Sequence, residues 1–287
     1  MNATIYDDRI CELGEGPLWH PIRKTLYWFD ILGKRMHSRG PEGTQTWQFN
    51  EHVSAAGWID HNTLLIASET ALMRFDLRDG ARNDLIALES DNQMTRSNDG
   101  RADPKGGFWI GTMGKKAEAE AGAIYRYFRG ELRKLHSSIT IPNAICFSAD
   151  GDIAYFADTT QRQIMRQEMD ENGWPAAEAV LHIDLTEEGL NPDGAVVDAD
   201  GCLWNAQWGA GRLARYAPDG SFLSAHLVPA RQPSCPAFGG KGANTLFTTT
   251  AIEGLTDPRA GEGSVFQFDL RPSGRFEPPV RLVSRSP

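Results

Sequence analysis

The chain has 287 residues, of which 40% are hydrophobic and 23% are charged, an ordinary composition for a soluble globular protein. Its formal net charge of −9 at pH 7 argues against nucleic acid and anionic membrane surfaces as partners. No apolar run approaches the roughly 20 residues of a membrane helix, and the first residues lack the basic flank and apolar core of a secretory signal. We therefore expect a cytoplasmic protein without nucleic-acid or membrane partners.

Short apolar and aromatic runs, broken by Gly, Pro, Asn and Asp, indicate an all-β protein. One run recurs six times along the chain, as TLYWFDI, TLLIASE, GFWIGTM, IAYFADT, CLWNAQW and TLFTTTA. Their third residues lie 38 to 49 residues apart and are Tyr27, Leu65, Trp109, Tyr155, Trp204 and Phe247. A further strand-like run follows each of them, and turn signals such as PEG, RDG, ENG and PDG come next.

Repeats of about 40–50 residues with four short strands each are typical of propeller blades. We predict a six-bladed β-propeller of four-stranded antiparallel blades around a central channel, formed by residues 1–287 as one domain. Because a ring of blades must close, the N-terminal run ATIYDDRICEL is expected to complete the sheet of the last blade. A β-sandwich with irregular strands is the alternative, but it does not account for six similar units.

The stretch NPDGAVVDADGCLW contains Asp-Gly twice. Asp200-Gly201 separates two apolar runs and predicts a hairpin turn, whereas Asp193-Gly194 lies at the start of a strand. Eleven or twelve residues before the six anchors, four units place an acid or amide beside Gly or Pro, and the other two place Ser54 and Cys235 or Pro236. The four polar residues are Glu15, Asn98, Asn143 and Asp193.

In a propeller, the first strand of each blade lines the channel, so these four side chains would converge on one axis. Two carboxylates there would repel each other unless a cation lay between them. Oxygen ligands suit Ca²⁺, Mg²⁺ or Mn²⁺, and Zn²⁺ less typically. The alternative is that each residue only caps a turn, but the register shared by separate units favours a metal site.

Four motifs, GEGPLWHP, RSNDGRADPKGGFWIGTM, IPNAICFSADG with YFADT, and NPDGAVVDADGCLWNAQWG, together resemble the regucalcin/gluconolactonase family of six-bladed propellers over almost the whole chain. The resemblance implies hydrolysis of a sugar lactone and one divalent metal held by Glu15, Asn143 and Asp193. It also implies that Arg96 and Asn98 contact the substrate. We expect Ca²⁺ as the ion, with Zn²⁺, Mn²⁺ or Mg²⁺ as alternatives, and Asp193 as the general base.

The stretch GTMGKKAEAEAG departs from the animal members of that family, in which an acidic residue after Gly-Thr-Met helps to hold sugar hydroxyls. Here Lys115 and Lys116 lie nearest that position. One hypothesis is that Lys116, or Lys115, pairs with a carboxylate of an aldaric or uronic lactone. The alternative is a solvated loop over the channel mouth.

The expected function is therefore metal-dependent hydrolysis of an aldono- or aldarolactone to the open-chain acid, by a monomer or small homo-oligomer. Two alternatives stay open: an esterase or phosphotriesterase-type hydrolase, and a non-catalytic calcium-binding propeller. No H-x-H or H-E-x-x-H pattern supports a histidine metal site, and His20 is expected at the surface or in a turn. The four cysteines form no C-x-x-C pair and are expected to be reduced thiols.

Overall fold

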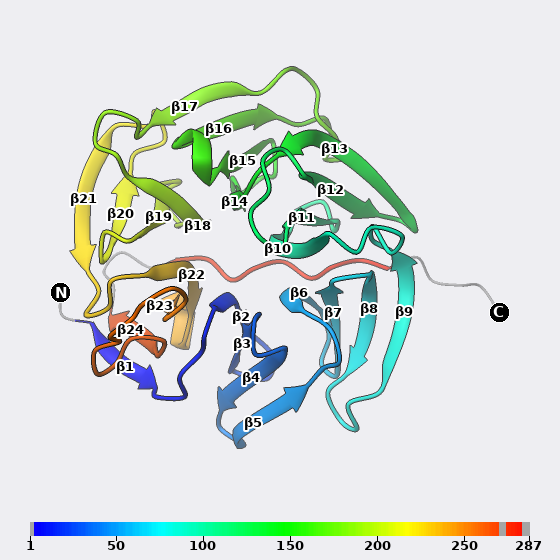
Figure 1. Ribbon diagram of the computed structural model, residues 1–287. Coiled ribbons are helices and arrows are strands. Elements are labelled where there is room, and N and C mark those ends of the chain that lie inside the picture. Colours follow the sequence, from blue (N-terminus) through cyan, green and yellow to red (C-terminus); the bar gives the residue numbers. More distant parts are fainter. Residues whose placement is uncertain (1–2, 270–273, 283–287) are drawn as a thin grey trace.

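The computed structural model describes residues 3–269 and 274–282 of the chain (Figure 1). Its strands form six four-stranded sheets, arranged as blades around a central axis. All pairings within the sheets are antiparallel, as in the β2–β3 and β10–β11 pairs. The six-bladed β-propeller predicted from the repeats is confirmed.

Each of the first five blades consists of four strands that are consecutive in the sequence. Blades 1 and 2 contain β2 (Gly14–His20), β3 (Thr25–Asp30), β4 (Arg35–Gly40), β5 (Gly43–Gln48), β6 (Val53–Asp60), β7 (Thr63–Ser68), β8 (Ala71–Asp76) and β9 (Arg82–Ala87). Blades 3 and 4 contain β10 (Thr95–Ala102), β11 (Phe108–Gly114), β12 (Gly122–Phe128), β13 (Glu131–Ile139), β14 (Pro142–Phe147), β15 (Ile153–Asp158), β16 (Gln163–Glu168) and β17 (Val180–Asp184). Blade 5 contains β18 (Asn191–Val197), β19 (Leu203–Trp208), β20 (Arg212–Tyr216) and β21 (Phe222–Leu227).

Blade 6 joins the two ends of the propeller. It contains β22 (Pro233–Gly239), β23 (Thr245–Thr250), β24 (Val265–Asp269) and, as its outer strand, β1 (Thr4–Asp7). The N-terminal strand therefore pairs antiparallel with β24 and links the sheet of blade 6 to blade 1. The two short 3-10 helices are η1 (Thr159–Gln161) and η2 (Lys241–Ala243), and no helix in the described part of the chain is long and apolar enough to cross a membrane.

The apolar runs of the repeat form the second strand of each blade and pack against the neighbouring blades. Trp109 of blade 3 meets Phe147 of blade 4 edge to face, with ring centroids 5.4 Å apart. Trp19 of blade 1 stacks on Phe247 of blade 6 at 5.7 Å, which joins the first blade to the last. Such aromatic pairs add to the stabilisation that burial itself provides.

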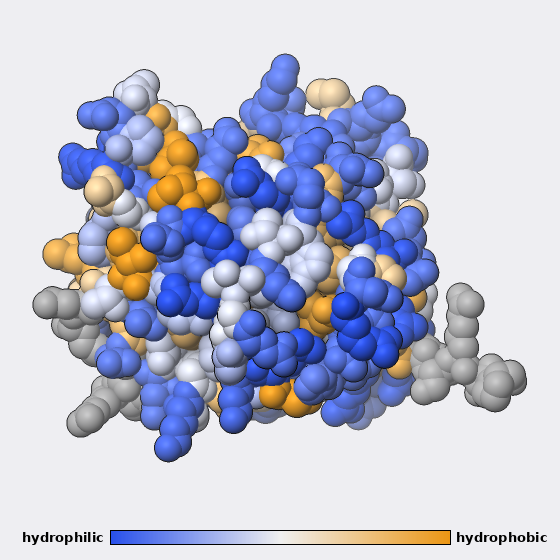
Figure 2. Space-filling model, turned by 90° about the horizontal axis from the view of Figure 1, so that it is seen from below, coloured by the Kyte–Doolittle hydropathy of each residue, from blue (hydrophilic) through white to orange (hydrophobic). Residues whose placement is uncertain are grey.

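The outer face seen from below Figure 1 is mostly hydrophilic, with hydrophobic side chains in small separate groups (Figure 2).

Residues 274–282 cross the ring at the end of the channel where the inner strands finish (Figure 1). The segment starts beside blade 6, where the amide of Gly274 donates to the carbonyl of Ala243, and reaches blade 2, where that of Val280 donates to Trp58 at 2.8 Å. On the way, the carboxylate of Glu277 forms an ion pair with the buried guanidinium of Arg101. We name residues 274–282 the C-terminal strap.

His20 corrects one expectation, because it is completely buried rather than exposed. Its Nε2 lies 2.9 Å from the carbonyl oxygen of Asp60, and its ring packs against Trp58 at 5.5 Å between blades 1 and 2. The Asp200-Gly201 turn is as predicted: it joins β18 to β19, and Gly201 has a φ of +78°, which glycine adopts readily. All four cysteines are free and buried.

Candidate functional site

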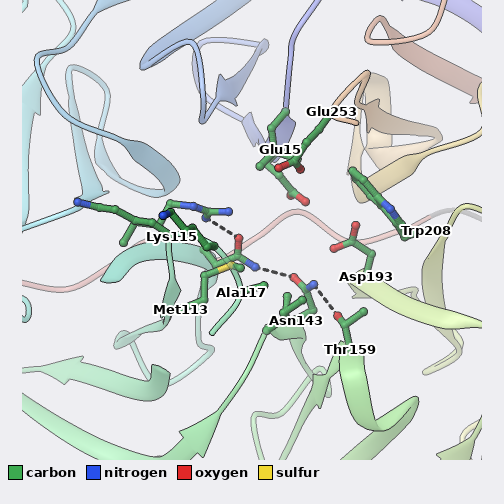
Figure 3. Close-up of a pocket in the computed structure, with 14 residues that line it drawn as sticks. Glu15, Met113, Lys115, Ala117, Asn143, Thr159, Asp193, Trp208 and Glu253 are labelled. Carbon is green, nitrogen blue, oxygen red and sulfur yellow. Dashed lines mark hydrogen bonds between the residues drawn. The ribbon is translucent and has the colours of Figure 1, made fainter. Parts of the chain in front are cut away.

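A cavity of about 340 Å³ opens at the end of the channel where the inner strands begin. This volume lies within the range of about 300–1,000 Å³ typical of small-molecule pockets. Its walls come from blades 1, 3, 4, 5 and 6 (Figure 3). All six predicted site residues line it: Glu15, Arg96, Asn98, Lys116, Asn143 and Asp193.

The inner strands share a local irregularity that turns these side chains toward the axis. Pairing with the second strand shifts register between Glu15 and Leu18 in β2, and between Asn143 and Cys146 in β14. The same shift occurs between Ser97 and Gly100 in β10 and between Pro192 and Ala195 in β18. Bulges of this kind bend a strand and redirect its side chains. The polar residues that interrupt the repeat therefore coincide with the bulges.

Asp193-Gly194 lies inside one such bulge. A Cβ atom at Gly194 would come within 2.3 Å of the Cys235 sulfur in β22, so the glycine permits β18 to approach the next inner strand. The side chain of Asp193 points into the cavity, as do those of Glu15 and Glu253, so that three carboxylates gather on one side (Figure 3). The first Asp-Gly pair thus places an acid in the channel and forms no hairpin turn.

Burial and mutual repulsion disfavour the charged form of both axial acids. Asp193 is 4% exposed, and its pKa is raised well above the usual value by burial, then by the charges of Glu15 and Asp99. Burial and the charge of Asp99 also raise the pKa of Glu15, and the guanidinium groups of Arg96 and Arg101 only partly oppose this. The positive charge near the two acids is therefore too small to compensate them fully.

A chain of hydrogen bonds fixes the amides (Figure 3). Arg96 Nη1 donates to Asn98 Oδ1 at 2.9 Å, Asn98 Nδ2 to Asn143 Oδ1 at 3.1 Å, and Asn143 Nδ2 to Thr159 Oγ1 at 2.8 Å. The Thr159 hydroxyl has one proton, which it gives to the carbonyl of Pro192 at 2.7 Å. It must accept from Asn143, so the Asn143 oxygen is turned toward the channel, and one of its two lone pairs stays available.

Glu15, Asn143 and Asp193 thus offer two buried carboxylates and one oriented amide oxygen from three blades. This oxygen-only donor set fits a hard divalent cation, which would also compensate the two acids. The remaining coordination positions would be open to water or to substrate. These three residues are the ones that the sequence predicts as ligands, and their role in binding a metal stays a prediction.

Arg96, in β10 of blade 3, lines the same cavity and is 5% exposed. Its Nη1 also donates to the carbonyl of Ser97 at 2.9 Å, while its Nε is buried without a hydrogen-bond partner among the described residues. Burial lowers the pKa of Arg96, and the nearby acids, Glu253 first, oppose the effect. A buried guanidinium held in this way is ready to bind oxygen atoms of a ligand.

The two lysines differ in their surroundings. Lys115 Nζ contacts the carboxylate of Glu69 and donates to the carbonyl of Gln93 at 2.9 Å, so its charge is already paired. Lys116 lines the cavity, and its ammonium group has no hydrogen-bond or ion-pair partner within residues 3–269 and 274–282. If either lysine meets a substrate anion, Lys116 is the one available.

Repeat analysis missed three groups near the cavity. Glu253 lies in the loop after β23 and Thr159 begins the short helix η1 after β15, so both lie outside the shared register of the inner strands. Asp99 follows Asn98 directly; its Oδ2 accepts from the amide of Ile145 at 2.8 Å, and its Oδ1 is buried without a partner in the described structure. Besides these three, the cavity contains Trp208, at the end of β19, which forms part of the wall beside Asp193.

The chain is similar to a family of known proteins over most of its length. A family model described as the SMP-30/Gluconolactonase/LRE-like region matches residues 13–252. A Rhizobium meliloti protein to which sugar lactone lactonase activity is ascribed is 44% identical, over 94% of each chain. L-arabinolactonase of Azospirillum brasilense is 36% identical, over 95% of this chain and 93% of its own. The crystal structure of regucalcin from Agrobacterium tumefaciens, a calcium-binding protein, superposes with a TM-score of 0.95 at 40% identity and covers 98% of each chain.

Proposed function

The chain belongs to the SMP-30/gluconolactonase/LRE-like family, and on that premise we propose that it is a lactonase that hydrolyses a sugar lactone with the help of one divalent cation. The observation that supports this most directly is the convergence of Glu15, Asn143 and Asp193 on one cavity of about 340 Å³. We propose these three residues as the ligands of the cation, with Ca²⁺ as the expected ion.

When bound, the cation would act as a Lewis acid that polarises the lactone carbonyl and makes water more acidic. The Asp193 carboxylate would accept the proton of the attacking water as its oxygen bonds to the carbonyl carbon. As the bond from that carbon to the ring oxygen breaks, Asp193 would return the proton to the ring oxygen. The product is the open-chain hydroxy acid, and Asp193 is ready for the next turnover.

Binding and orientation of the sugar would fall to Arg96, Asn98 and Trp208. The guanidinium can donate to two adjacent oxygens of the substrate, and its bond to Asn98 keeps both side chains in place. The indole of Trp208 would cover one face of the sugar ring beside Asp193. These groups would hold the carbonyl carbon near the base, which lowers the entropic cost of reaching the reactive geometry.

Lys116 bears on the choice between lactones. Because its ammonium is unpaired at the cavity wall, we propose that it binds the second carboxylate of an aldarolactone. The variant Lys116→Met should raise KM for an aldarolactone up to about fivefold, because Lys116 is exposed and an exposed ion pair contributes about 0–1 kcal/mol, and it should leave a neutral aldonolactone unaffected. Lys115→Met is the matched control, since that lysine is already paired with Glu69. Equal losses on both substrates would remove the idea.

The proposed function is tested with chelator-treated protein, a panel of aldono- and aldarolactones and a pH indicator, after subtraction of spontaneous ring opening. We expect turnover to return on addition of a divalent cation and to fall at least 10²-fold in Asp193→Asn, the usual contribution of a general base. A protein that binds the cation and turns over no lactone would contradict the proposal and favour a non-catalytic role.

A further inference from the structure

A second group of possible ligands lies apart from the cavity, at the seam between blades 1 and 6. Cys11, in the segment that connects β1 to β2, lies beside Asp30 at the end of β3 and His37 in β4. The cysteine sulfur, a carboxylate oxygen and a ring nitrogen all lie within 4.8 Å of one another. All three residues are at most 3% exposed.

The histidine has the arrangement of a metal ligand. Its Nδ1 lies 2.9 Å from the hydroxyl of Thr46, which fixes the ring and takes up one nitrogen. Its Nε2 is buried and has no hydrogen-bond partner in the described part of the chain. Metal-binding histidines characteristically engage a partner through the second nitrogen in this way. A buried polar atom without a hydrogen-bond partner costs about 1–3 kcal/mol, and a metal bound to this nitrogen would remove that cost.

Asp30 is held in place for a ligand role. Its Oδ1 accepts from the amides of Leu13 and Gly33, both at 3.1 Å, and its Oδ2 lies 3.6 Å from Arg35, which is 43% exposed and can turn to solvent. Arg9, the other nearby cation, is paired with Asp7 at 2.8 Å. The carboxylate therefore keeps an oxygen for a metal without losing its backbone contacts.

Cys11 ties this group to the closure of the ring. Its amide donates to the carbonyl of Gly263 in blade 6 at 3.0 Å, and its side chain packs in a cluster formed by residues of blades 1 and 6. A metal bound jointly by Cys11, Asp30 and His37 would fasten the segment after β1 to the sheet of blade 1. The link would reinforce the place where the chain passes from β1 of the last blade to β2 of the first.

We propose that Cys11, Asp30 and His37 bind a structural divalent metal of the zinc class, separate from the cation of the cavity. One thiolate, one imidazole and one carboxylate suit Zn²⁺, whereas the oxygen donors of the cavity suit Ca²⁺. Binding releases the thiol proton of Cys11 to solvent, and the sulfur then donates an electron pair to the metal.

The test uses Co²⁺, which reports thiolate ligation by a charge-transfer band in the near ultraviolet. Full-length protein is produced in minimal medium containing Co²⁺, so that the buried group is loaded during folding, and is then freed of loosely held metal. We expect the band in the wild type, in Asp193→Asn and in the control Cys202→Ser, which removes another buried thiol. We expect it to be absent from Cys11→Ser, with a melting temperature several degrees lower.

If Cys11→Ser fails to fold, X-ray absorption on the folded Asp193→Asn protein decides the matter. A shell containing one sulfur around cobalt supports the proposal. A protein that holds no cobalt, or holds it with oxygen and nitrogen ligands alone, overturns it. In that case Cys11 is only a buried thiol that donates to the carbonyl of Arg9, and His37 is a buried neutral ring in the seam.

Discussion

The ion pair between Arg101 and Glu277 holds the C-terminal strap over the end of the channel, and it offers a quantitative test. The two side chains are 5% and 9% exposed. Arg101 also donates to the carbonyl of Ile145 at 3.0 Å and to that of Pro236 at 3.4 Å, so it cannot leave its place easily. Glu277→Gln keeps the shape of the strap and removes its charge.

We expect this change to lower the free energy of unfolding by about 3 kcal/mol, near the lower end of the 3–5 kcal/mol lost when one partner of a buried pair is removed. The lower end applies for two reasons. The amide oxygen of glutamine still accepts a hydrogen bond from Arg101. The carboxylate of Asp99 also lies near enough to Arg101 to raise its pKa, as Glu277 does, against the effect of burial, and it remains in the variant. Without the pair, the guanidinium remains buried and is only partly compensated.

Urea unfolding followed by tryptophan fluorescence measures the loss. The control is Glu168→Gln, which breaks the Arg166–Glu168 pair at 3.1 Å, where the side chains are 30% and 60% exposed. Such surface pairs contribute about 0–1 kcal/mol. If Glu277→Gln and Glu168→Gln cost the same, the strap is not held by this charge and the reasoning fails.

Three further changes test the site and the packing. Gly16 has a φ of +52°, and a Cβ there would lie 2.2 Å from a backbone oxygen of blade 2, so Gly16→Ala should displace Glu15 and lower lactone turnover more than tenfold. The control is Gly130→Ala, with a φ of +87° and open space around it, which should cost about 1 kcal/mol of stability and no activity. Trp208→Ala should raise KM about 5- to 30-fold by removing about 1–2 kcal/mol of apolar contact, with less change in kcat; an unchanged KM would show that the indole does not touch the sugar. Burial lowers the pKa of His136 to about 4, so the folded protein favours the neutral ring. The resulting stability is present above the unfolded pKa of about 6.5 and is lost as the pH falls toward 4. Urea titrations at each pH should therefore show that His136→Phe loses up to about 3 kcal/mol less than the wild type between those pH values.

The repeat made the fold predictable, because its apolar runs are the second strands of the blades. The same register located the polar residues of the inner strands, since Glu15, Asn98, Asn143 and Asp193 stand where packing alone would place apolar or small side chains. Their convergence followed from the closure of the ring. The sequence therefore predicted the architecture and the polar residues that meet in the cavity, whereas their binding of a metal stays a prediction.

Features outside the repeat were not predictable in this way. Glu253 reaches the cavity from the loop after β23, and Thr159 reaches it from the start of η1; the course of both segments depends on neighbouring blades. The C-terminal strap has no repeat pattern, and its position became clear only from the pairing of Glu277 with Arg101. The expectation that His20, which follows GEGPLW, lies at the surface or in a turn was wrong, because the seam between blades 1 and 2 supplies a backbone oxygen for its ring nitrogen.

The most direct measurement is anomalous diffraction from a crystal grown with Mn²⁺, an ion that prefers oxygen ligands. We expect one strong peak in the cavity, at roughly 2.0–2.6 Å from oxygens of Glu15, Asn143 and Asp193, as found for oxygen-bound divalent cations. A cavity without a peak at saturating Mn²⁺, or a peak bound by none of these three residues, would contradict the assignment of the metal site and the mechanism that depends on it.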